Sequence, residues 1–316
     1  MPRRSNPRWA VILAGGDGSR LQPLTQLLFG NQRPKQFCRI LGQSTLLAET
    51  AERLSQTVER ESTIYVVTRH HEAYYRDDLQ QVPPSHVVEQ PLNRGTTVAV
   101  ASALMRIRQL TSADPVVGFF PADHSFTDGS ALDGLLGDAF AAASGLSDRV
   151  VLVGARATAP EADFGWIEAG DQMRGLASRS ASPGRVHAVR RFLEKPSPEV
   201  AGRLFQEAWW WNTFISVGRA SAFADLLATA APAVWRPFSV VADAPLVRHA
   251  ELMRILYATF PPLDFSRDVL APHPERLAVI GPLDAGWTDL GQPYRVLETM
   301  ALRRVPRPKL LRRLAG

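Results

Sequence analysis

Residues 9–20 read WAVILAGGDGSR. The first five are apolar, which predicts a buried strand, and three glycines follow within the four positions Gly15 to Gly18. Because glycine has no side chain, the backbone N–H groups of such a loop can converge closely on an anion. Arg20, together with Lys35 in the nearby run Arg33–Lys35, supplies positive charge. The stretch therefore predicts a strand followed by a loop that holds a polyphosphate.

This loop differs from two common phosphate-binding loops. It lacks the Gly-Lys-Ser/Thr ending of a Walker A loop, and Leu21 stands where a dinucleotide fingerprint has its third glycine. A glycine turn at a strand end, with no ligand, is the alternative interpretation for Gly15 to Gly18 taken alone. The cations at Arg20 and Arg33–Lys35 favour the polyphosphate.

Strands and helices alternate after the loop. Apolar, β-branched runs predict strands at 64–68, 86–89, 116–120 and 150–154, and apolar spacing predicts helices at 46–56, 96–109 and 132–144. This order predicts an α/β fold with a doubly wound, mostly parallel sheet. In such sheets ligands lie outside the carboxyl ends of the strands, which is where the glycine loop and Asp123 fall.

The second half of the chain shows a different pattern. Polar turns separate predicted strands at 166–168, 186–190 and 214–217, with a helix at 220–229 and mainly helical structure from 231 to 260. The pattern predicts one catalytic domain over 9–302, made of a nucleotide half (about 9–155) and an α+β half for a second substrate (about 156–302). Residues 1–8 and 303–316 are interpreted as basic tails, and 174–185 as a low-order segment.

The positive charge is concentrated at the two ends. The chain has 316 residues and a net charge of +5, but residues 9–302 carry 27 basic against 31 acidic residues. A nucleic-acid binder needs a basic stripe on the folded surface, interleaved with aromatics, so we expect no nucleic-acid partner.

Cysteine content and hydropathy indicate the cellular compartment of the protein. Cys38 is the single cysteine, which excludes an intramolecular disulfide and indicates a reducing compartment. The apolar run after the basic start breaks at Gly15, shorter than a signal peptide requires, and no segment reaches transmembrane length. We therefore expect a cytoplasmic protein with no membrane insertion.

Further short motifs follow the first loop in a fixed order. Together with residues 13–25 and RPKQF (33–37), they are QPLNRGT (90–96), PADH (121–124), FGWI (164–167), FLEKP (192–196), WNTF (211–214) and GWTDLG (286–291). In this order the motifs resemble those of the sugar-1-phosphate nucleotidyltransferases, and PKQF is similar to the mannose-1-phosphate guanylyltransferase (GDP-mannose pyrophosphorylase) branch. The resemblance covers roughly residues 9 to 299. It implies a Rossmann-like nucleotidyltransferase fold with a sugar-binding half.

The resemblance also implies which residues bind the nucleotide. They are Leu13, Ala14, Gly15, Gly16, Gly18, Ser19, Glu89, Gln90, Arg94, Gly95 and Thr96. The base-reading segment departs from the commonest family form, because Asn93 replaces a glycine and Gly95 an asparagine. Guanine presents N–H donors that a carboxylate can accept, and Glu89 is the hypothesis for that role.

Asp123 is predicted to be catalytic, with Arg20 and Lys35. It ends an apolar strand, so its carboxylate is presented at the mouth of the sheet, where Mg²⁺ bound to nucleotide phosphates takes one or two carboxylates. The resemblance implies Asp289 as the second metal ligand. A helix or turn cap is the alternative for either aspartate. His124 is interpreted as a structural hydrogen-bonding residue.

A sugar phosphate needs both an acceptor and a cation, and Glu194 and Lys195 supply them. The resemblance implies these roles, with Gly165 allowing close backbone approach and Asn212 bonding a hydroxyl. An exposed turn with two solvated charges is the alternative. Elsewhere, His70 and His71 lack the H-E-x-x-H metal spacing, because Tyr75 takes the place of the second histidine.

The predicted reaction needs no general base. A sugar 1-phosphate oxygen is already anionic at neutral pH, so alignment and charge neutralisation suffice for in-line attack on the α-phosphorus of a nucleoside triphosphate. GTP and α-D-mannose 1-phosphate would give GDP-mannose and pyrophosphate. A glucose-1-phosphate uridylyl- or thymidylyltransferase, or a non-catalytic sugar-nucleotide-binding regulatory subunit, are the alternatives. We expect a single activity, since little chain follows residue 291, and a homo-oligomer is possible.

Overall fold

The computed structural model describes residues 7–173, 185–242 and 249–305. Most of the low-order segment predicted at 174–185, and most of the two basic tails, lie outside these described residues. None of the helices in the described ranges is long and apolar enough to cross a lipid bilayer.

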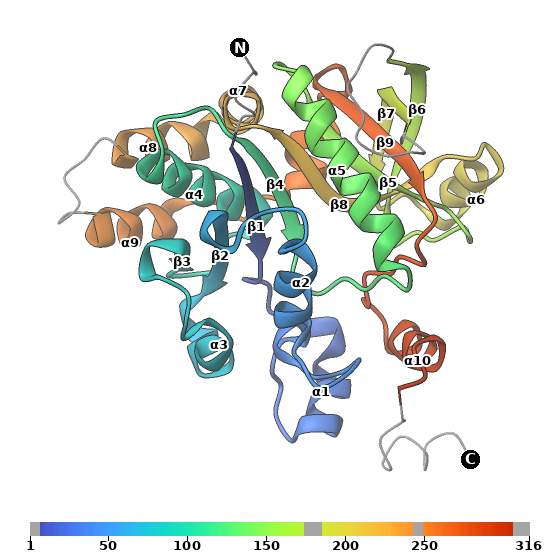
Figure 1. Cartoon of the computed structure of the whole chain (residues 1–316), viewed down its shortest axis with the longest axis horizontal. Coiled ribbons are helices and arrows are strands. Elements are labelled where there is room, and N and C mark those ends of the chain that lie inside the picture. The colour runs from blue at the N-terminus through green and yellow to red at the C-terminus, as the bar shows by residue number, and fades with distance from the viewer. Residues whose placement is uncertain (1–6, 174–184, 243–248, 306–316) are drawn as a thin grey trace.

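A nine-stranded sheet runs through the described residues in the order β3-β2-β1-β4-β8-β5-β9-β7-β6 (Figure 1). Its strands are β1 (Arg8–Leu13), β2 (Thr63–Thr68), β3 (Val87–Gln90), β4 (Val116–Pro121), β5 (Val150–Arg156), β6 (Gly165–Gln172), β7 (Arg185–Glu194), β8 (Trp210–Arg219) and β9 (Leu277–Leu283).

Parallel pairing is concentrated at one end of the sheet. β1 pairs parallel with β2 and β4, and β2 with β3, which confirms the doubly wound α/β arrangement predicted there. β8 enters antiparallel between β4 and β5, while β7 pairs antiparallel with β6 and β9. β5, expected to extend the parallel series, is parallel only to β9, a strand that sequence reasoning missed. The sheet as a whole is mixed, and both predicted halves contribute to it.

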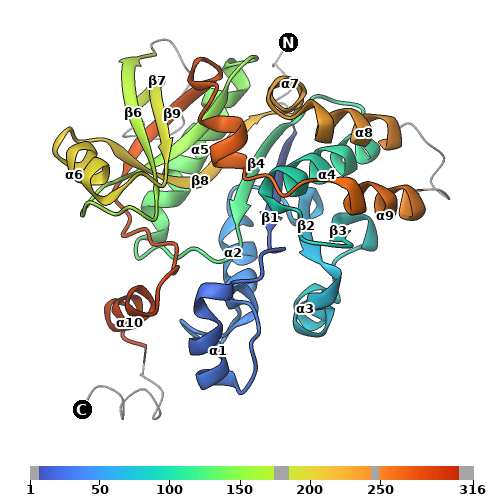
Figure 2. The same cartoon turned by 180° about the vertical axis from the view of Figure 1, so that it is seen from behind.

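Helices cover both faces of the sheet (Figures 1 and 2). α4 (Gly95–Leu110), α7 (Ala220–Ala230), α8 (Pro232–Ala242) and α9 (His249–Thr259) pack on one face, and α2 (Leu46–Leu54), α3 (Glu72–Leu79) and α5 (Gly129–Gly145) on the other. α1 (Gln22–Phe29) and α10 (Pro293–Leu302) share a third apolar cluster, and α6 (Pro198–Gln206) belongs to a fourth. The sheet is thus enclosed between two apolar layers, as its buried strands require.

Several helix starts follow from local side chains. Thr45 Oγ1 accepts a hydrogen bond from the Ala48 amide (3.1 Å), and Asp128 Oδ1 accepts one from the Ala131 amide (3.0 Å). Ser197 caps α6 in the same way, followed by Pro198 in the first turn. Such caps satisfy amides that have no partner inside the helix, which explains why α2, α5 and α6 begin where they do.

Candidate active site

The glycine loop follows β1, and two side chains hold it by donating hydrogen bonds to its carbonyl oxygens. The Gln36 side chain donates to the carbonyls of Ala14 (3.0 Å) and Gly16 (2.6 Å), and the Thr68 hydroxyl donates to that of Gly15 (2.8 Å). Three successive carbonyls are therefore occupied by the protein itself. These contacts within the protein set the shape of the loop.

Two of its glycines are required for different reasons. A Cβ on Gly15 would lie 2.5 Å from Gln90 Nε2 and 2.9 Å from Thr68 Oγ1, so a side chain there would have to displace both of these groups. Gly18 has φ +60°, in the left-handed region that other residues rarely adopt. The sequence argument gave close approach to an anion as the reason for both, and the structure adds these two constraints.

A cavity of about 450 Å³ opens beside this loop. Of the predicted site residues it is lined by Leu13, Gly15, Gly16, Gly18, Gln90, Gly95, Thr96 and Asp123. Phe214, Asp264 and Arg267 line it as well. Its size is that of ordinary small-ligand sites, and residues from segments far apart in the sequence meet in it.

A second cavity, of about 240 Å³, adjoins the first. It is lined by Gly18, Ser19, Arg20, Leu21, Lys35, Asp123 and Gly291. Gly18 and Asp123 line both cavities. Asp123 therefore stands at their junction, with both predicted loop cations in the smaller cavity.

Lys35 connects the two predicted metal ligands. Its buried ammonium lies 3.2 Å from Asp123 Oδ2 and donates to the backbone carbonyl of Asp289. Asp289 Oδ1 accepts hydrogen bonds from Arg295 Nη1 (2.9 Å) and from the Gly291 amide (2.8 Å). The Gly291 bond is the turn-capping role that was the alternative for Asp289.

The environment of Asp289 favours its charged form. Burial opposes ionisation, but Lys35, His124, Arg295 and the Gly291 amide outweigh it and hold the pKa of Asp289 below its usual value. Asp289 is thus an anion, and the Lys35 ammonium that contacts Asp123 also donates to the Asp289 backbone carbonyl.

Arg20 and Arg295 both pair with acidic residues of the loop between β5 and β6. Half-exposed Arg20 lies 3.6 Å from Asp163 in the loop between β5 and β6. Arg295, on α10, is buried and pairs with Glu161 (2.6 Å) as well as Asp289. The Arg295 guanidinium also stacks on the Phe164 ring, 4.3 Å from its centroid.

Glu89 and Arg94 are directed to other partners. Glu89 accepts from Arg69 Nε (2.6 Å) and from the Tyr75 hydroxyl (3.0 Å), while Arg94 Nε donates to the Tyr257 carbonyl (2.7 Å). Neither residue lines either cavity described above. Base reading by Glu89 stays a prediction, and it requires those two bonds to be exchanged for bonds to the base.

The four predicted sugar-phosphate residues form a group apart from the two cavities. A Cβ on Gly165 would lie 2.5 Å from Glu194 Oε2 and 3.1 Å from Asn212 Cβ, so three of them are in contact. Lys195 Nζ lies 3.8 Å from Glu194 Oε1. Asn212 Nδ2 donates to the Ser266 hydroxyl (3.3 Å). The grouping predicted from motifs far apart in sequence is thus present in the fold.

The pKa of Glu194 is shifted in the opposite direction from that of Asp289. Burial, reinforced by the negative charge of Asp264, raises its pKa to about 7, and Lys195 and Arg267 only partly offset this. Near neutral pH it therefore exchanges between an acceptor carboxylate and a neutral carboxyl that can also donate.

His124 has the structural role predicted for it. Trp287 Nε1 donates to His124 Nδ1 (3.1 Å), and burial lowers the pKa of His124 to about 4. The ring is neutral, and its Nε2 atom lies 3.9 Å from Asp123 Oδ1, too far for a hydrogen bond.

Sequence reasoning missed several residues of the site. Gln36 lies inside a quoted motif but was given no role, although it fixes the loop. Asp264 and Arg267 lie on the segment that follows α9, where no local pattern indicated a site. Arg295 occupies an ordinary helical position, and its contacts with Glu161 and Asp289 come from segments distant in sequence.

Curated relatives match most of this chain. It is 32% identical over 287 residues to the xanthan biosynthesis protein XanB of Xanthomonas campestris, covering 89% of this chain and 57% of the relative. It is 30% identical over 311 residues to the mannose-1-phosphate guanylyltransferase ManC of Salmonella typhimurium, covering 92% of this chain and 59% of the relative. The chain therefore spans somewhat over half the length of these curated relatives.

A solved structure and a family model agree with this match. A Thermus thermophilus crystal structure described as a mannose-1-phosphate geranyltransferase is similar with a TM-score of 0.74 and 27% identity, over 90% of this chain and 76% of that one. The family model for nucleotidyl transferases matches residues 9–302. With loop, cavities and cations all inside the matched region, the chain belongs to the nucleotidyl transferase family.

Proposed function

We propose that this chain transfers a guanylyl group from GTP to α-D-mannose 1-phosphate, giving GDP-mannose and pyrophosphate. The observation that carries the proposal is Asp123 at the junction of two cavities, with Lys35 bonded to it and Arg20 beside it. This is the arrangement that a metal-bound triphosphate needs. The choice of GTP and mannose 1-phosphate rests on the name of the Salmonella relative and on the PKQF motif.

The junction fits a divalent cation. Nucleotidyl transferases generally use a divalent metal ion, and we propose Mg²⁺ here. The Asp123 side chain is 25% exposed and lines both cavities. Asp289 lines neither cavity and its Oδ1 is bonded to Arg295 and Gly291, so Oδ2 is the oxygen that it would offer as a second ligand. Mg²⁺ is commonly held by one or two carboxylates together with substrate phosphates. When bound, it would neutralise charge on the α-phosphoryl oxygens.

The protein side chains supply alignment and charge. Lys35 is fixed by two oxygen partners and therefore presents its ammonium at one place in the smaller cavity. Arg20 would exchange Asp163 for the β- and γ-phosphates and stabilise the leaving pyrophosphate. Charge neutralisation of this kind accounts for much of catalysis in phosphoryl transfer.

The sugar phosphate would occupy the other group of residues. Glu194 and Asn212 would orient its hydroxyls, and Lys195 would pair with its phosphate. The anionic phosphate oxygen then attacks the α-phosphorus in line with the departing pyrophosphate, so no side chain has to remove a proton.

Pyrophosphate release tests the proposal. GTP, ATP, UTP and dTTP should each be paired with mannose and glucose 1-phosphates in the presence of Mg²⁺. The proposal expects the highest kcat/KM for GTP with mannose 1-phosphate. A different preferred pair would correct the substrate and keep the enzyme class. Nucleotide-sugar binding without turnover for any pair would support the regulatory-subunit alternative.

We also infer the cytosol as the place of action. The inference rests on the single cysteine, Cys38, which is a buried thiol in the structure. Immunolocalisation, or fractionation of the native host cells, would test it.

A further inference from the structure

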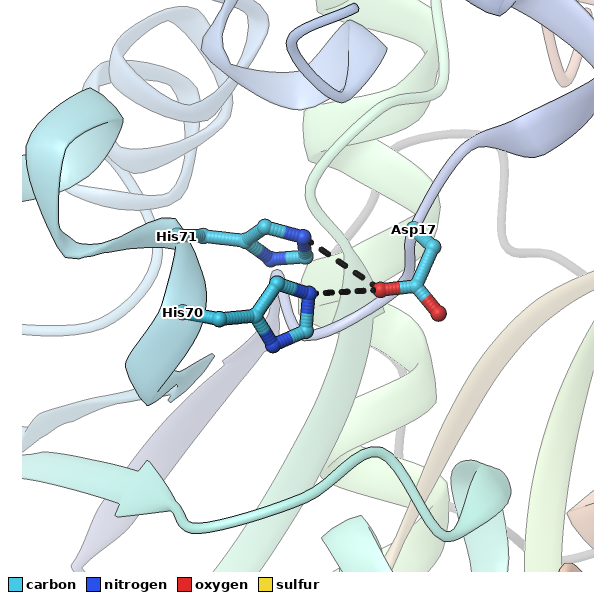
Figure 3. Close-up of side chains that lie close together, drawn as sticks. All are labelled: Asp17, His70 and His71. Carbon is cyan, nitrogen blue, oxygen red and sulfur yellow. Dashed lines mark hydrogen bonds and ion pairs between the residues drawn. The ribbon is translucent and has the colours of Figure 1, made fainter.

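Asp17, His70 and His71 bring three metal-binding atoms together beside the glycine loop (Figure 3). Asp17 Oδ1 lies 3.1 Å from His70 Nε2 and 3.3 Å from His71 Nε2. The aspartate comes from the loop between β1 and α1, and the histidines from the short turn that follows β2. The H-E-x-x-H rule missed this group because it considers one helix only, whereas these ligand atoms come from two separate segments.

The distances between these atoms suit a bound transition metal. Zinc lies about 2.0–2.2 Å from imidazole nitrogen and carboxylate oxygen, so neighbouring ligand atoms of a tetrahedral site are roughly 3.3 Å apart. Both nitrogen–oxygen distances are close to this value, and the three atoms all lie within 4.8 Å of one another. A cation could therefore replace the His70–Asp17 hydrogen bond and the His71–Asp17 contact with little movement of the side chains.

We propose that Asp17, His70 and His71 form a binding site for a divalent transition metal of the Zn²⁺ class, separate from the Asp123 site. Two imidazoles and one carboxylate select Zn²⁺, Co²⁺ or Ni²⁺ over Mg²⁺, which prefers oxygen ligands. The His70 and Asp17 side chains are exposed, so water would be able to fill the fourth position.

The surroundings support this assignment. Asn93 Nδ2 donates to Asp17 Oδ2 (2.9 Å), which leaves Oδ1 directed at the histidines and orients the carboxylate from behind. The His71 side chain is only 5% exposed, so the surrounding protein fixes the position of its ring. The His70 side chain is 56% exposed and gives the ion a way in.

Occupancy of this site would act on the nucleotide cavity through the loop. Asp17 lies between Gly16 and Gly18, both of which line that cavity. A metal bound to Asp17 would tie the loop to the turn after β2 and restrict it. The site would thus stabilise the loop in the shape that the cavity requires.

Metal titration of the untagged full chain tests the proposal. Zn²⁺ is added in competition with a chromophoric chelator, with excess Mg²⁺ present to occupy the carboxylate site. We expect one Zn²⁺ per chain, and at least a tenfold loss of affinity in His70→Gln. His273→Gln is the matched control, because His273 also pairs with an acidic side chain, Glu275, but lies outside the cluster.

Co²⁺ reports the geometry of the same site. We expect the intense visible bands of four-coordinate Co²⁺ in the wild type and in His273→Gln, and their loss in His70→Gln. His70 is exposed, so its replacement is expected to fold, and circular dichroism verifies this. Zn²⁺ affinity unchanged in His70→Gln, equally reduced in His273→Gln, or no stoichiometric binding at all would each overturn the proposal.

Discussion

The two sides of the candidate site treat their acidic groups in opposite ways. On the phosphate side, Asp123 and Asp289 share the Lys35 cation, and the pKa of Asp289 is held low. On the sugar side, Glu194 is buried near Asp264, and its pKa is raised to about 7. One side is therefore charged and compensated before any ligand binds, whereas the other is poised to change its protonation. This contrast suits a site that holds phosphates on one side and hydroxyl groups on the other.

Removing the charge of Asp123 should have the largest effect. Asp123→Asn keeps the shape of the side chain but removes the anion that faces both cavities, and we expect turnover to fall about 10³-fold, a loss typical of removing one key electrostatic group. Steady-state pyrophosphate release measures it.

Asp128→Asn is the matched control for Asp123→Asn. Asp128 also follows β4, but it is an exposed helix cap, a role that asparagine performs well. Its rate should stay within about twofold of wild type. If Asp123→Asn retained a near wild-type rate, Asp123 would have no role in metal binding, and the phosphate side would lose its distinctive feature.

Arg295, which pairs with both Glu161 and Asp289, should contribute strongly to the free energy of unfolding. Arg295→Met leaves Glu161 and Asp289 without their shared buried cation, and breaking a buried pair in this way costs about 3 kcal/mol of unfolding free energy. Urea denaturation measures it. Arg190→Met is the control, since Arg190 pairs with Glu168 at an exposed site and should cost about 0.5 kcal/mol. Equal losses in both variants would show that Arg295 is an ordinary surface cation.

The raised pKa of Glu194 should make the free energy of unfolding depend on pH. Its folded pKa of about 7 lies above the unfolded value of 4.5, so between these pH values Glu194 binds more protons in the folded state, and its own contribution to stability falls as pH rises. His71 and His124, whose folded pKa values of about 4 lie below the unfolded value of 6.5, contribute a slope of the opposite sign, so the Glu194 contribution is the difference between the variant and the wild type. The full loss is on the order of 3 kcal/mol. Glu194→Gln should remove this fall and stabilise the protein above pH 7, as measured by urea denaturation from pH 5 to 8.

Glu168→Gln is the control for Glu194→Gln. Glu168 lies on β6, which pairs with the Glu194 strand β7, and its pKa is shifted in the opposite direction. Arg191 and Arg190 hold the pKa of Glu168 below its usual value, so its stabilising contribution is present above pH 4.5 and is lost only at lower pH. The Glu168→Gln variant should therefore keep the wild-type slope between pH 5 and 8. A wild-type slope in Glu194→Gln as well would mean that Glu194 is not the titrating group.

The phosphate side was the more predictable of the two from sequence. Its loop directly follows β1, Asp123 closely follows β4, and both strands are short apolar runs whose parallel pairing places these ends at one edge. The strand just before the glycine loop and the strand just before Asp123 are local signals, whereas Asp289 was predicted only through the resembled family. The boundaries of β1, β2 and β4 agree with prediction to within one residue.

The sugar side was predicted only through motifs of the resembled family. Its strands pair antiparallel across long sequence separations, such as β6 with β8, and β9 gave no recognised signal. Asp264 and Arg267, which set the charge around Glu194, come from a segment about seventy residues further along the chain. No local pattern encodes such a neighbour, so the raised pKa of Glu194 could not be read from sequence.

Lys195 tests whether the sugar side binds the substrate phosphate. Its side chain is 54% exposed and pairs loosely with Glu194, so its loss should leave the fold intact. Lys195→Ala removes one charge-assisted contact, worth about 1.4 kcal/mol, and should raise KM for the sugar 1-phosphate about tenfold while changing kcat little. Arg190→Ala, an exposed cation elsewhere on β7, should leave KM unchanged. A fall in kcat with KM unaltered would place Lys195 in the reaction itself, and the division between a phosphate-activating side and a sugar-binding side would have to be redrawn.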